Sequence, residues 1–247
     1  MRSTRIYSPQ KLVAETTIEL AGTAARHVAQ VLRMVTGDPL VLFDGSGNEF
    51  QGSIQSASKN RVTVALGNAQ QPATESSLNI TLWHGLCRSS RMDSVVQKAT
   101  ELGVTAIQPV LTDHGTVRLD AKRSAKKTGH WRNVAISACE QSGRVLIPGI
   151  EEPRMLADCL DRFRTNQSTS VKAIMCDPDG KSGIGQHLNP GKDIVLLTGP
   201  EGGFSQAEKI AAAGAGFSLV SLGPRVLRTE TAPVTAISLL QHLAGDL

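Results

Sequence analysis

The chain has 247 residues, of which 40% are hydrophobic, 19% charged and 3% aromatic, with a formal net charge of +4. No apolar run reaches the roughly 18 residues of a membrane helix, so we expect no membrane contact. The scarcity of aromatic residues argues against an RNA-binding surface built from stacked rings, and any nucleic-acid contact must come from clustered basic side chains.

The N-terminal segment "MRSTRIYSPQK" lacks the apolar stretch of a secretory signal, so we expect a cytoplasmic protein. The four cysteines of the chain, Cys87, Cys139, Cys159 and Cys176, include no C-x-x-C pair. They are expected to be reduced, buried thiols, and no metal site is predicted.

Residues 1–72 predict a small β-barrel domain, because short apolar strands alternate with turn residues in "RIYS", "PLVLFDGSG", "EFQGSIQSA" and "RVTVALGN". One helical insertion is predicted in "TAARHVAQVLRMVTGD". Val28, Val31, Leu32 and Val35 recur there at helical spacing, and Gly37 is the expected stop. The polar stretch 68–77 reads as a linker.

Residues 73–247 predict an α/β domain with a mostly parallel sheet, because apolar strands and amphipathic helices alternate along them. The strands are expected in "LNITLWHGL", "AIQPVLT", "VKAIMCD", "DIVLLTG" and "SLVSLG". Ligands of such sheets bind at the carboxyl ends of the strands. Two glycine-containing loops stand at such ends, after "DIVLL" and after "SLVSL".

The first loop, "GPEGGF", contains Gly199, Gly202 and Gly203, which permit close approach of the backbone to a ligand. Ser205 and Glu208 form a capping-box pattern that predicts the start of a helix. The lysine of a P-loop and the spacing of a dinucleotide fingerprint are both missing. A phosphate cradle is therefore disfavoured, and a purely structural turn stays open as an alternative.

The second loop, "LGPRVLRTETAP", bends at Gly223 and carries Arg225, Arg228 and Glu230 before a helix that should begin near Thr231. Either these charges form a solvated ion pair, or Arg228 and Glu230 face a polar pocket that binds or activates a substrate. The apolar face expected for the helix comprises Val234, Ile237, Leu240 and Leu243.

The stretch "LDAKRSAKKTGHWR" is basic and predicts either a phosphate-binding helix face or a solvated one. Its candidates for RNA contact are Lys122, Arg123 and Lys126. Arg144, after the helix stop at Gly143, either reaches the substrate or caps helix carbonyls.

Four stretches together, "LTGPEGGFSQAE", "LGPRVLRTETAPVTAI", "MDSVVQKATELGVTAIQPV" and "ACEQSGRVLIP", closely resemble the RsmE family of the SPOUT superfamily. The resemblance covers nearly the whole chain. It implies a PUA-like N-terminal β-barrel, a C-terminal α/β domain with a deep trefoil knot, and a homodimer. It further implies S-adenosylmethionine-dependent methylation of N3 of one uridine in 16S ribosomal RNA of the small subunit.

The resemblance also implies site residues. The cofactor set carried over by motif is Leu197, Thr198, Gly199, Glu201, Gly202, Gly203, Leu222, Gly223, Leu227 and Arg228. The N-terminal domain would seat the RNA through Arg5, Tyr7, Arg26, His27 and Arg33.

For catalysis, we expect Arg228 to stabilise negative charge on the uracil oxygens, while Glu230 or Glu201 orients it or takes the N3 proton. The loop after "AIQPVL" departs from many family members, because Asp113 and His114 stand where those carry a Glu-Arg pair and an arginine follows only at Arg118. This departure bears on substrate contacts in that loop more than on cofactor binding.

Two alternatives remain at this stage. One is a methyltransferase of the same superfamily that acts on another RNA, because loops and barrel rather than the knot select the substrate. The other is a non-catalytic RNA-binding factor for ribosome assembly.

Overall fold

The computed structural model describes residues 4–117, 120–165, 171–187 and 193–247. The chain divides into two compact units. The N-terminal unit contains residues 1–75 together with 139–147, and the C-terminal unit contains 76–138 together with 148–247. Among the described residues, no helix combines the length and the apolar character that crossing a membrane requires.

The N-terminal unit is built on a five-stranded sheet in the order β1-β3-β4-β5-β2. Only the β1–β3 pairing is parallel. Along β5, alternate residues Val62, Val64 and Leu66 are buried, as expected for a strand with one face on the core. The strands are β1 (Arg5–Tyr7), β2 (Thr17–Ala21), β3 (Pro39–Phe43), β4 (Glu49–Ala57) and β5 (Arg61–Gln70).

The helical insertion of this unit is shorter than predicted. It consists of α1 (Gly22–Arg26) and one π-helical turn, η1 (His27–Val31). Arg33 then adopts a left-handed conformation, φ 54°, which ends the helical path four residues before Gly37. Only Val28 among the predicted apolar positions is buried, whereas Val31, Leu32 and Val35 are 40–67% exposed. The helical spacing therefore predicted the wrong buried residues in this segment.

The C-terminal unit is an α/β domain with a sheet in the order β11-β13-β10-β12-β6-β7-β8, in which β9 also pairs with β7. Every pairing among its described strands is parallel, which confirms the predicted class. The strands are β6 (Asn79–Gly85), β7 (Ala106–Leu111), β8 (Gly149–Ile150), β9 (Arg154–Met155), β10 (Lys172–Cys176), β11 (Ser182–Gly183), β12 (Asp193–Thr198) and β13 (Ser218–Ser221).

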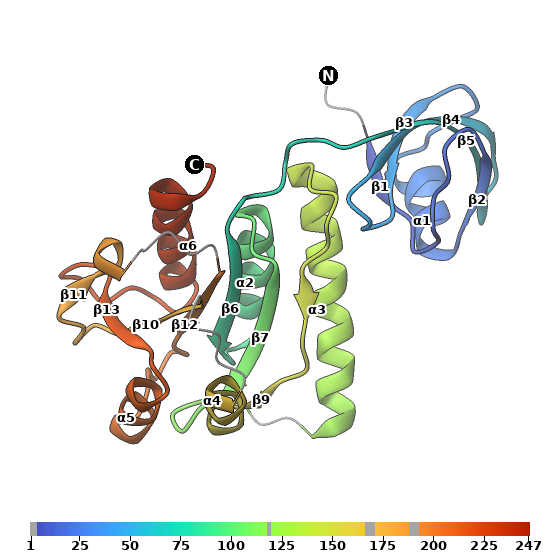
Figure 1. Ribbon diagram of the computed structural model, residues 1–247. Helices are drawn as coiled ribbons and strands as arrows, with labels where there is room; N and C mark the ends of the chain where they lie inside the picture. The colour runs from blue at the N-terminus through green and yellow to red at the C-terminus, as the bar shows by residue number, and fades with distance from the viewer. Residues whose placement is uncertain (1–3, 118–119, 166–170, 188–192) are drawn as a thin grey trace. The chain divides into compact units, whose positions relative to one another are not determined.

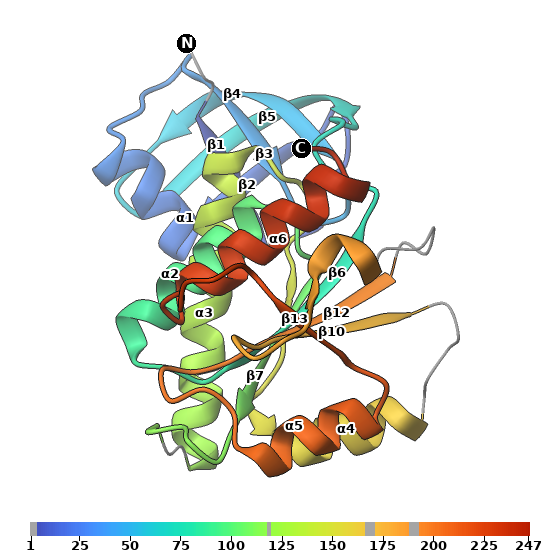
Figure 2. The ribbon, with the colours of Figure 1, turned by 90° about the vertical axis from the view of Figure 1, so that its left-hand side faces the viewer.

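Helices cover both faces of this sheet. Figure 2 shows α2 with α6 on one side of the strands and α4 with α5 on the other. Between α4, α5 and the sheet, the rings of Trp83, Phe163 and Phe217 pack together at centroid distances of 5.2–5.9 Å. The helices are α2 (Ser89–Glu101), α3 (Ala121–Ser142), α4 (Leu156–Thr165), α5 (Gln206–Gly214) and α6 (Thr231–Ala244), with the short 3-10 turn η2 (Ile184–His187).

The last helix starts at Thr231, as predicted, and returns from the end of β13 to pack on α2 and β6 (Figure 1). Ile237 and Leu240 are buried as expected, but Leu243 is half exposed. The buried contact ends at Gln241, whose side chain donates to the Leu102 carbonyl and accepts from Ser76.

Candidate functional site

One pocket of about 520 Å³ lies in the C-terminal unit at the carboxyl ends of three neighbouring strands. Gly199 to Phe204 follow β12, and Ser221 to Thr229 follow β13; the sequence predicted both segments there. A third wall, Cys176 to Pro178, follows β10, which lies between the other two strands and which the sequence analysis missed. The same strand-end rule would have found it, since β10 is parallel to both neighbours.

Glycines allow backbone segments around this pocket to approach one another closely. A Cβ on Gly85, at the end of β6, would lie 2.3 Å from Pro200, and one on Gly180 would lie 2.3 Å from the Val220 carbonyl carbon. Gly203 (φ 67°) and Gly223 (φ 112°) adopt conformations that disfavour side chains, and a Cβ on either would enter open space. Close backbone packing therefore supports the pocket from behind, and Gly203 and Gly223 leave room for a ligand in front.

The donor set suits a cationic, phosphate-free ligand such as S-adenosylmethionine. Leu222, Val226 and Leu227 offer apolar surface for an aromatic base, and the volume falls in the range of small-molecule sites. Asp177 contributes a carboxylate of which 3% is exposed, held by Lys209 Nζ at 2.9 Å from its Oδ1. No lysine of the P-loop type is among the described residues that line the pocket.

Arg91 of α2 links the two glutamates that the sequence analysis proposed for catalysis. Its Nη1 lies 2.9 Å from Glu201 Oε1, and its Nε lies 3.7 Å from Glu230 Oε2. Glu201 also accepts from the Arg88 amide at 3.4 Å. Burial raises the pKa of Glu201, but these hydrogen bonds and the Arg91 charge outweigh it, so that the pKa lies below its usual value. Arg91 gave no signal in the sequence, because nothing in its spacing connects α2 with the two loops.

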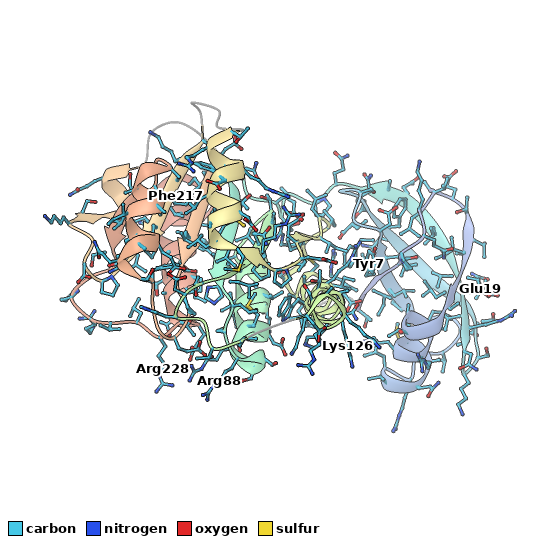
Figure 3. The ribbon with its side chains drawn as sticks, turned by 90° about the horizontal axis from the view of Figure 1, so that it is seen from below. Tyr7, Glu19, Arg88, Lys126, Phe217 and Arg228 are labelled. Atoms are coloured by element: carbon cyan, nitrogen blue, oxygen red, sulfur yellow. The ribbon has the colours of Figure 1, made fainter. Side chains whose placement is uncertain are left out.

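Arg228 lines the pocket, and its side chain is exposed. Within the described part of the chain it has no ion-pair partner; both glutamates face Arg91 instead. Seen from below, Arg228 and Arg88 extend away from the ribbon at the same edge of the C-terminal unit (Figure 3). The free guanidinium of Arg228 is therefore available to an incoming group.

His84 is fully buried behind the pocket, and the sequence analysis did not predict it. It is the register partner of Thr198 across β6 and β12, and its Nδ1 lies 2.8 Å from Thr198 Oγ1. Its Nε2 lies 3.5 Å from Thr229 Oγ1 and 3.7 Å from Cys87 Sγ. Burial lowers the pKa of His84 to about 4, although the negative charge of Glu201 opposes that shift, so the imidazole is neutral.

The loop after β7 contacts the first glycine loop and the residue that caps the helix behind it. Ser205 and Glu208 form the predicted capping box, and Ser205 Oγ also donates to Asp113 Oδ2 at 2.6 Å. The His114 ring nitrogen Nδ1 lies 3.1 Å from the Gly202 carbonyl oxygen. Asp113 and His114 thus contact the pocket loop, whereas Arg118 lies outside the described residues.

Eight of the ten residues expected to hold the cofactor line the pocket: Gly199, Glu201, Gly202, Gly203, Leu222, Gly223, Leu227 and Arg228. Leu197 lies in the hydrophobic core, and Thr198 bonds to His84 behind the pocket wall.

The basic residues proposed for RNA contact in the N-terminal unit differ in accessibility. Arg5 forms an ion pair with Glu49, donates to the Arg144 carbonyl and is 10% exposed. Tyr7 is partly buried and packs on Phe43 at 5.7 Å between ring centroids. The other three, Arg26, His27 and Arg33, lie at least partly exposed on and after the short helix.

Arg144 is buried, with 4% of its side chain exposed, and pairs with Glu75 at 2.8 Å within the N-terminal unit. The other Glu75 oxygen accepts from the backbone amides of Val145 and Leu146. By contrast, the three candidates on α3, Lys122, Arg123 and Lys126, are exposed.

Comparisons with known proteins agree with this architecture. Residues 74–241 match the RNA methyltransferase domain family, and residues 20–66 match the RNA methyltransferase PUA domain. The chain is 32% identical to ribosomal RNA small subunit methyltransferase E of Buchnera aphidicola, with 100% of this chain and 98% of that one covered. The counterpart from Bacillus subtilis is 29% identical, with 96% of both covered.

Solved structures give the same result. A putative methyltransferase from Legionella pneumophila in complex with bound S-adenosylmethionine superimposes with a TM-score of 0.92 at 40% identity over both whole chains. Ribosomal RNA small subunit methyltransferase E from Neisseria gonorrhoeae, bound to S-adenosylmethionine, gives 0.92 at 36% identity, again over both whole chains.

A PUA-type unit combined with a parallel α/β unit whose strand-end loops form a glycine-walled pocket defines an RNA methyltransferase. Within that class, the chain belongs to the ribosomal RNA small subunit methyltransferase E family.

Proposed function

We propose that the protein transfers a methyl group from S-adenosylmethionine to N3 of a specific uridine in 16S ribosomal RNA of the small subunit. The pocket at the ends of β10, β12 and β13 carries this proposal, because its glycine-rich walls fit a phosphate-free nucleoside ligand. Relatives over the full length of the chain bear the name of that rRNA methyltransferase, and two similar structures contain the cofactor.

The bound cofactor would supply an electrophilic methyl group, so the protein must align N3 and remove its proton. Glu201 accepts hydrogen bonds from Arg91 and from the Arg88 amide. Glu230 Oε2 is buried, has no hydrogen-bond partner among the described residues and lies 3.7 Å from Arg91 Nε. We therefore assign proton acceptance to Glu230 and an orienting role to Glu201. Arg228 would stabilise the negative charge that develops on the uracil oxygens.

For the RNA, we propose contact through the exposed basic residues. In the N-terminal unit these are Arg26, His27 and Arg33, with Tyr7 at their margin, and on α3 they are Lys122, Arg123 and Lys126. Arg5 and Arg144 are themselves buried and paired with carboxylates, so we assign them to holding the unit together.

We further propose the trefoil knot and the homodimer of the family for this chain, acting in the cytoplasm. Two features support the knot: α6 crosses back from β13 to β6, and Thr229 Oγ1 donates to the Gly199 carbonyl at 2.8 Å where the two loops meet. Half-exposed Leu239 and Leu243 on α6 offer apolar surface to a partner. Light scattering of the purified chain would measure the dimer directly.

The deciding experiment supplies tritiated S-adenosylmethionine and small ribosomal subunits from a strain that lacks this protein, and then maps the modified base. We expect label at N3 of one uridine in 16S rRNA. Label in another RNA would support the substrate alternative. Cofactor binding without transfer to any RNA would contradict the enzyme assignment, and absence of cofactor binding would favour a non-catalytic assembly factor.

Variants test the assigned roles. Arg228→Ala and Glu230→Gln should each lower turnover more than about a hundredfold, about 2.7 kcal/mol of barrier, while calorimetry still detects cofactor binding. Arg162→Ala, an exposed arginine on α4, should retain the wild-type rate. Near-normal turnover of either site variant would remove that residue from the mechanism.

A further inference from the structure

A chain of buried hydrogen bonds runs behind the pocket from β12 through β6 to the start of α6. It joins Thr198, His84 and Thr229 and ends on the carbonyl oxygen of Gly199. We propose that this relay, with His84 at its centre, positions the Gly199–Phe204 loop and so keeps the pocket formed before any ligand arrives.

The relay has one consistent direction. Thr229 Oγ1 donates its single proton to the Gly199 carbonyl at 2.8 Å, so its oxygen can only accept from His84 Nε2 at 3.5 Å. His84 then carries its proton on Nε2, and its bare Nδ1 accepts from the Thr198 hydroxyl at 2.8 Å. A neutral imidazole is required for that pattern, since a protonated ring has no acceptor nitrogen.

The end of the relay acts on the first residue of the loop. Gly199 lines the pocket, and the next turn is closed by the Gly203 amide, which donates to the Pro200 carbonyl at 3.0 Å. Gly85, directly after His84, lets Pro200 approach so closely that a Cβ would lie 2.4 Å from its nitrogen. His84 and Gly85 therefore form a seat for the loop that was not apparent from the glycine motif.

The relay also connects the two loops that form the pocket. Thr198 and Gly199 belong to the β12 end, whereas Thr229 belongs to the segment after β13 that carries Arg228 and Glu230. Without the Thr229 hydroxyl, the Gly199 carbonyl would lose this partner at a partly buried position on the pocket wall. Arg91, which contacts a glutamate of each loop, would still link them.

Hydrogen exchange of the free protein tests the relay without any cofactor. Thr229→Val removes the hydroxyl but keeps the volume, and should speed exchange of the Gly203 amide at least tenfold. Thr229→Ser restores the hydroxyl and should return exchange to within about threefold of wild type. Thr235→Val is the matched control, because Thr235 also donates to a backbone carbonyl, that of Thr231, but on α6 away from the loop.

A second measurement rests on the proposed function, namely the dissociation constant for S-adenosylmethionine and the two Michaelis constants. Thr229→Val should raise the dissociation constant and the KM for the cofactor at least tenfold, with the KM for RNA within about twofold of wild type. If wild-type protein binds no cofactor, the proposed function fails, while the exchange measurement still decides the relay.

Equal exchange of Gly203 in Thr229→Val and Thr235→Val would overturn the inference. If Thr229→Val does not fold, Thr198→Val takes its place at the other end of the relay. Exchange of Gly203 that is accelerated in Thr198→Val supports the relay, and unchanged exchange overturns it.

Discussion

The two units use arginine in opposite ways. In the N-terminal unit, Arg144 is almost fully buried against Glu75, and Arg5 is nearly so against Glu49. In the C-terminal unit, Arg91 is 36% exposed between Glu201 and Glu230 at the pocket. A buried guanidinium needs a carboxylate partner, and such a pair holds segments of chain together.

A half-exposed guanidinium keeps part of its hydration and can exchange partners when a ligand binds. We therefore expect solvent exposure, rather than residue type, to separate a structural arginine from one that responds to a ligand. It also explains why Arg144 fitted a substrate-binding hypothesis when only its position after Gly143 was known. Four predictions test this contrast.

The largest expected effect is on the buried pair. Arg144→Ala leaves the Glu75 carboxylate without its cation and should lower the free energy of unfolding of the N-terminal unit by about 3–5 kcal/mol. Arg164→Ala, which breaks an exposed pair with Asp161, should cost less than about 0.5 kcal/mol. Urea unfolding followed by segment-resolved hydrogen exchange measures both, and equal effects would contradict the contrast.

The second prediction concerns a buried group that must stay uncharged. His84 has a pKa of about 4 when folded, against 6.5 for an ordinary histidine. The contribution of His84 to the free energy of unfolding should therefore be fully present above pH 6.5 and fall as the pH drops toward 4. Between these values the unfolded chain binds a proton on the ring that the folded chain excludes. The loss amounts to roughly 3 kcal/mol, at about 1.4 kcal/mol per tenfold change in proton affinity.

His84→Gln supplies the comparison for that measurement. It removes the titrating ring, so the difference in unfolding free energy between wild type and variant should shrink or reverse as the pH falls from 6.5 to 4. Carboxylates titrate in both proteins and cancel in that difference. A difference that does not vary with pH would show that the ring binds a proton equally well in the folded and the unfolded chain, which would contradict the prediction.

A smaller effect is expected at the start of α5. Ser205 accepts from the Glu208 amide and donates to Asp113, so it stabilises both the helix and the glycine loop next to it. Ser205→Ala should cost about 1 kcal/mol of stability. Ser94→Ala is the control, because Ser94 is exposed in the middle of α2 and bonds only its own helix. Thermal unfolding distinguishes the two, and matching midpoints would mean that the capping box contributes nothing.

Local patterns sufficed for the capping box, the start of α6 and the strands β6, β7, β10, β12 and β13, whereas the short strands β2, β8, β9 and β11 were not predicted. Each depends on residues close together in sequence, such as Ser205 with Glu208 or the apolar run that forms β12. The pocket loops followed from the rule that parallel strands bind ligands at their carboxyl ends.

The site residues that could not be predicted from the sequence depend on contacts between residues far apart in the chain. Arg91 reaches Glu201 from 110 positions away, and His84 reaches Thr229 from 145. The predicted length of the helix in the N-terminal unit was wrong for a different reason. The left-handed conformation of Arg33 ends the helical segment, although no glycine or proline marks that stop in the sequence. Side-chain identity alone encodes neither a distant partner nor an unusual backbone conformation.

The smallest effect on stability, but a distinct effect on RNA, is expected on the exposed face of α3. Lys126→Gln should change the free energy of unfolding by less than about 0.5 kcal/mol, because an exposed charge gains little from folding. If Lys126 contacts a phosphate, the variant should lower the slope of log affinity against log salt concentration by about 0.7–0.9. Lys209→Gln would be a poor control, because Lys209 is tied to Asp177 and Asp179. Arg162→Gln, exposed on α4, should leave the slope unchanged, so a difference between the two variants assigns the RNA to the α3 face.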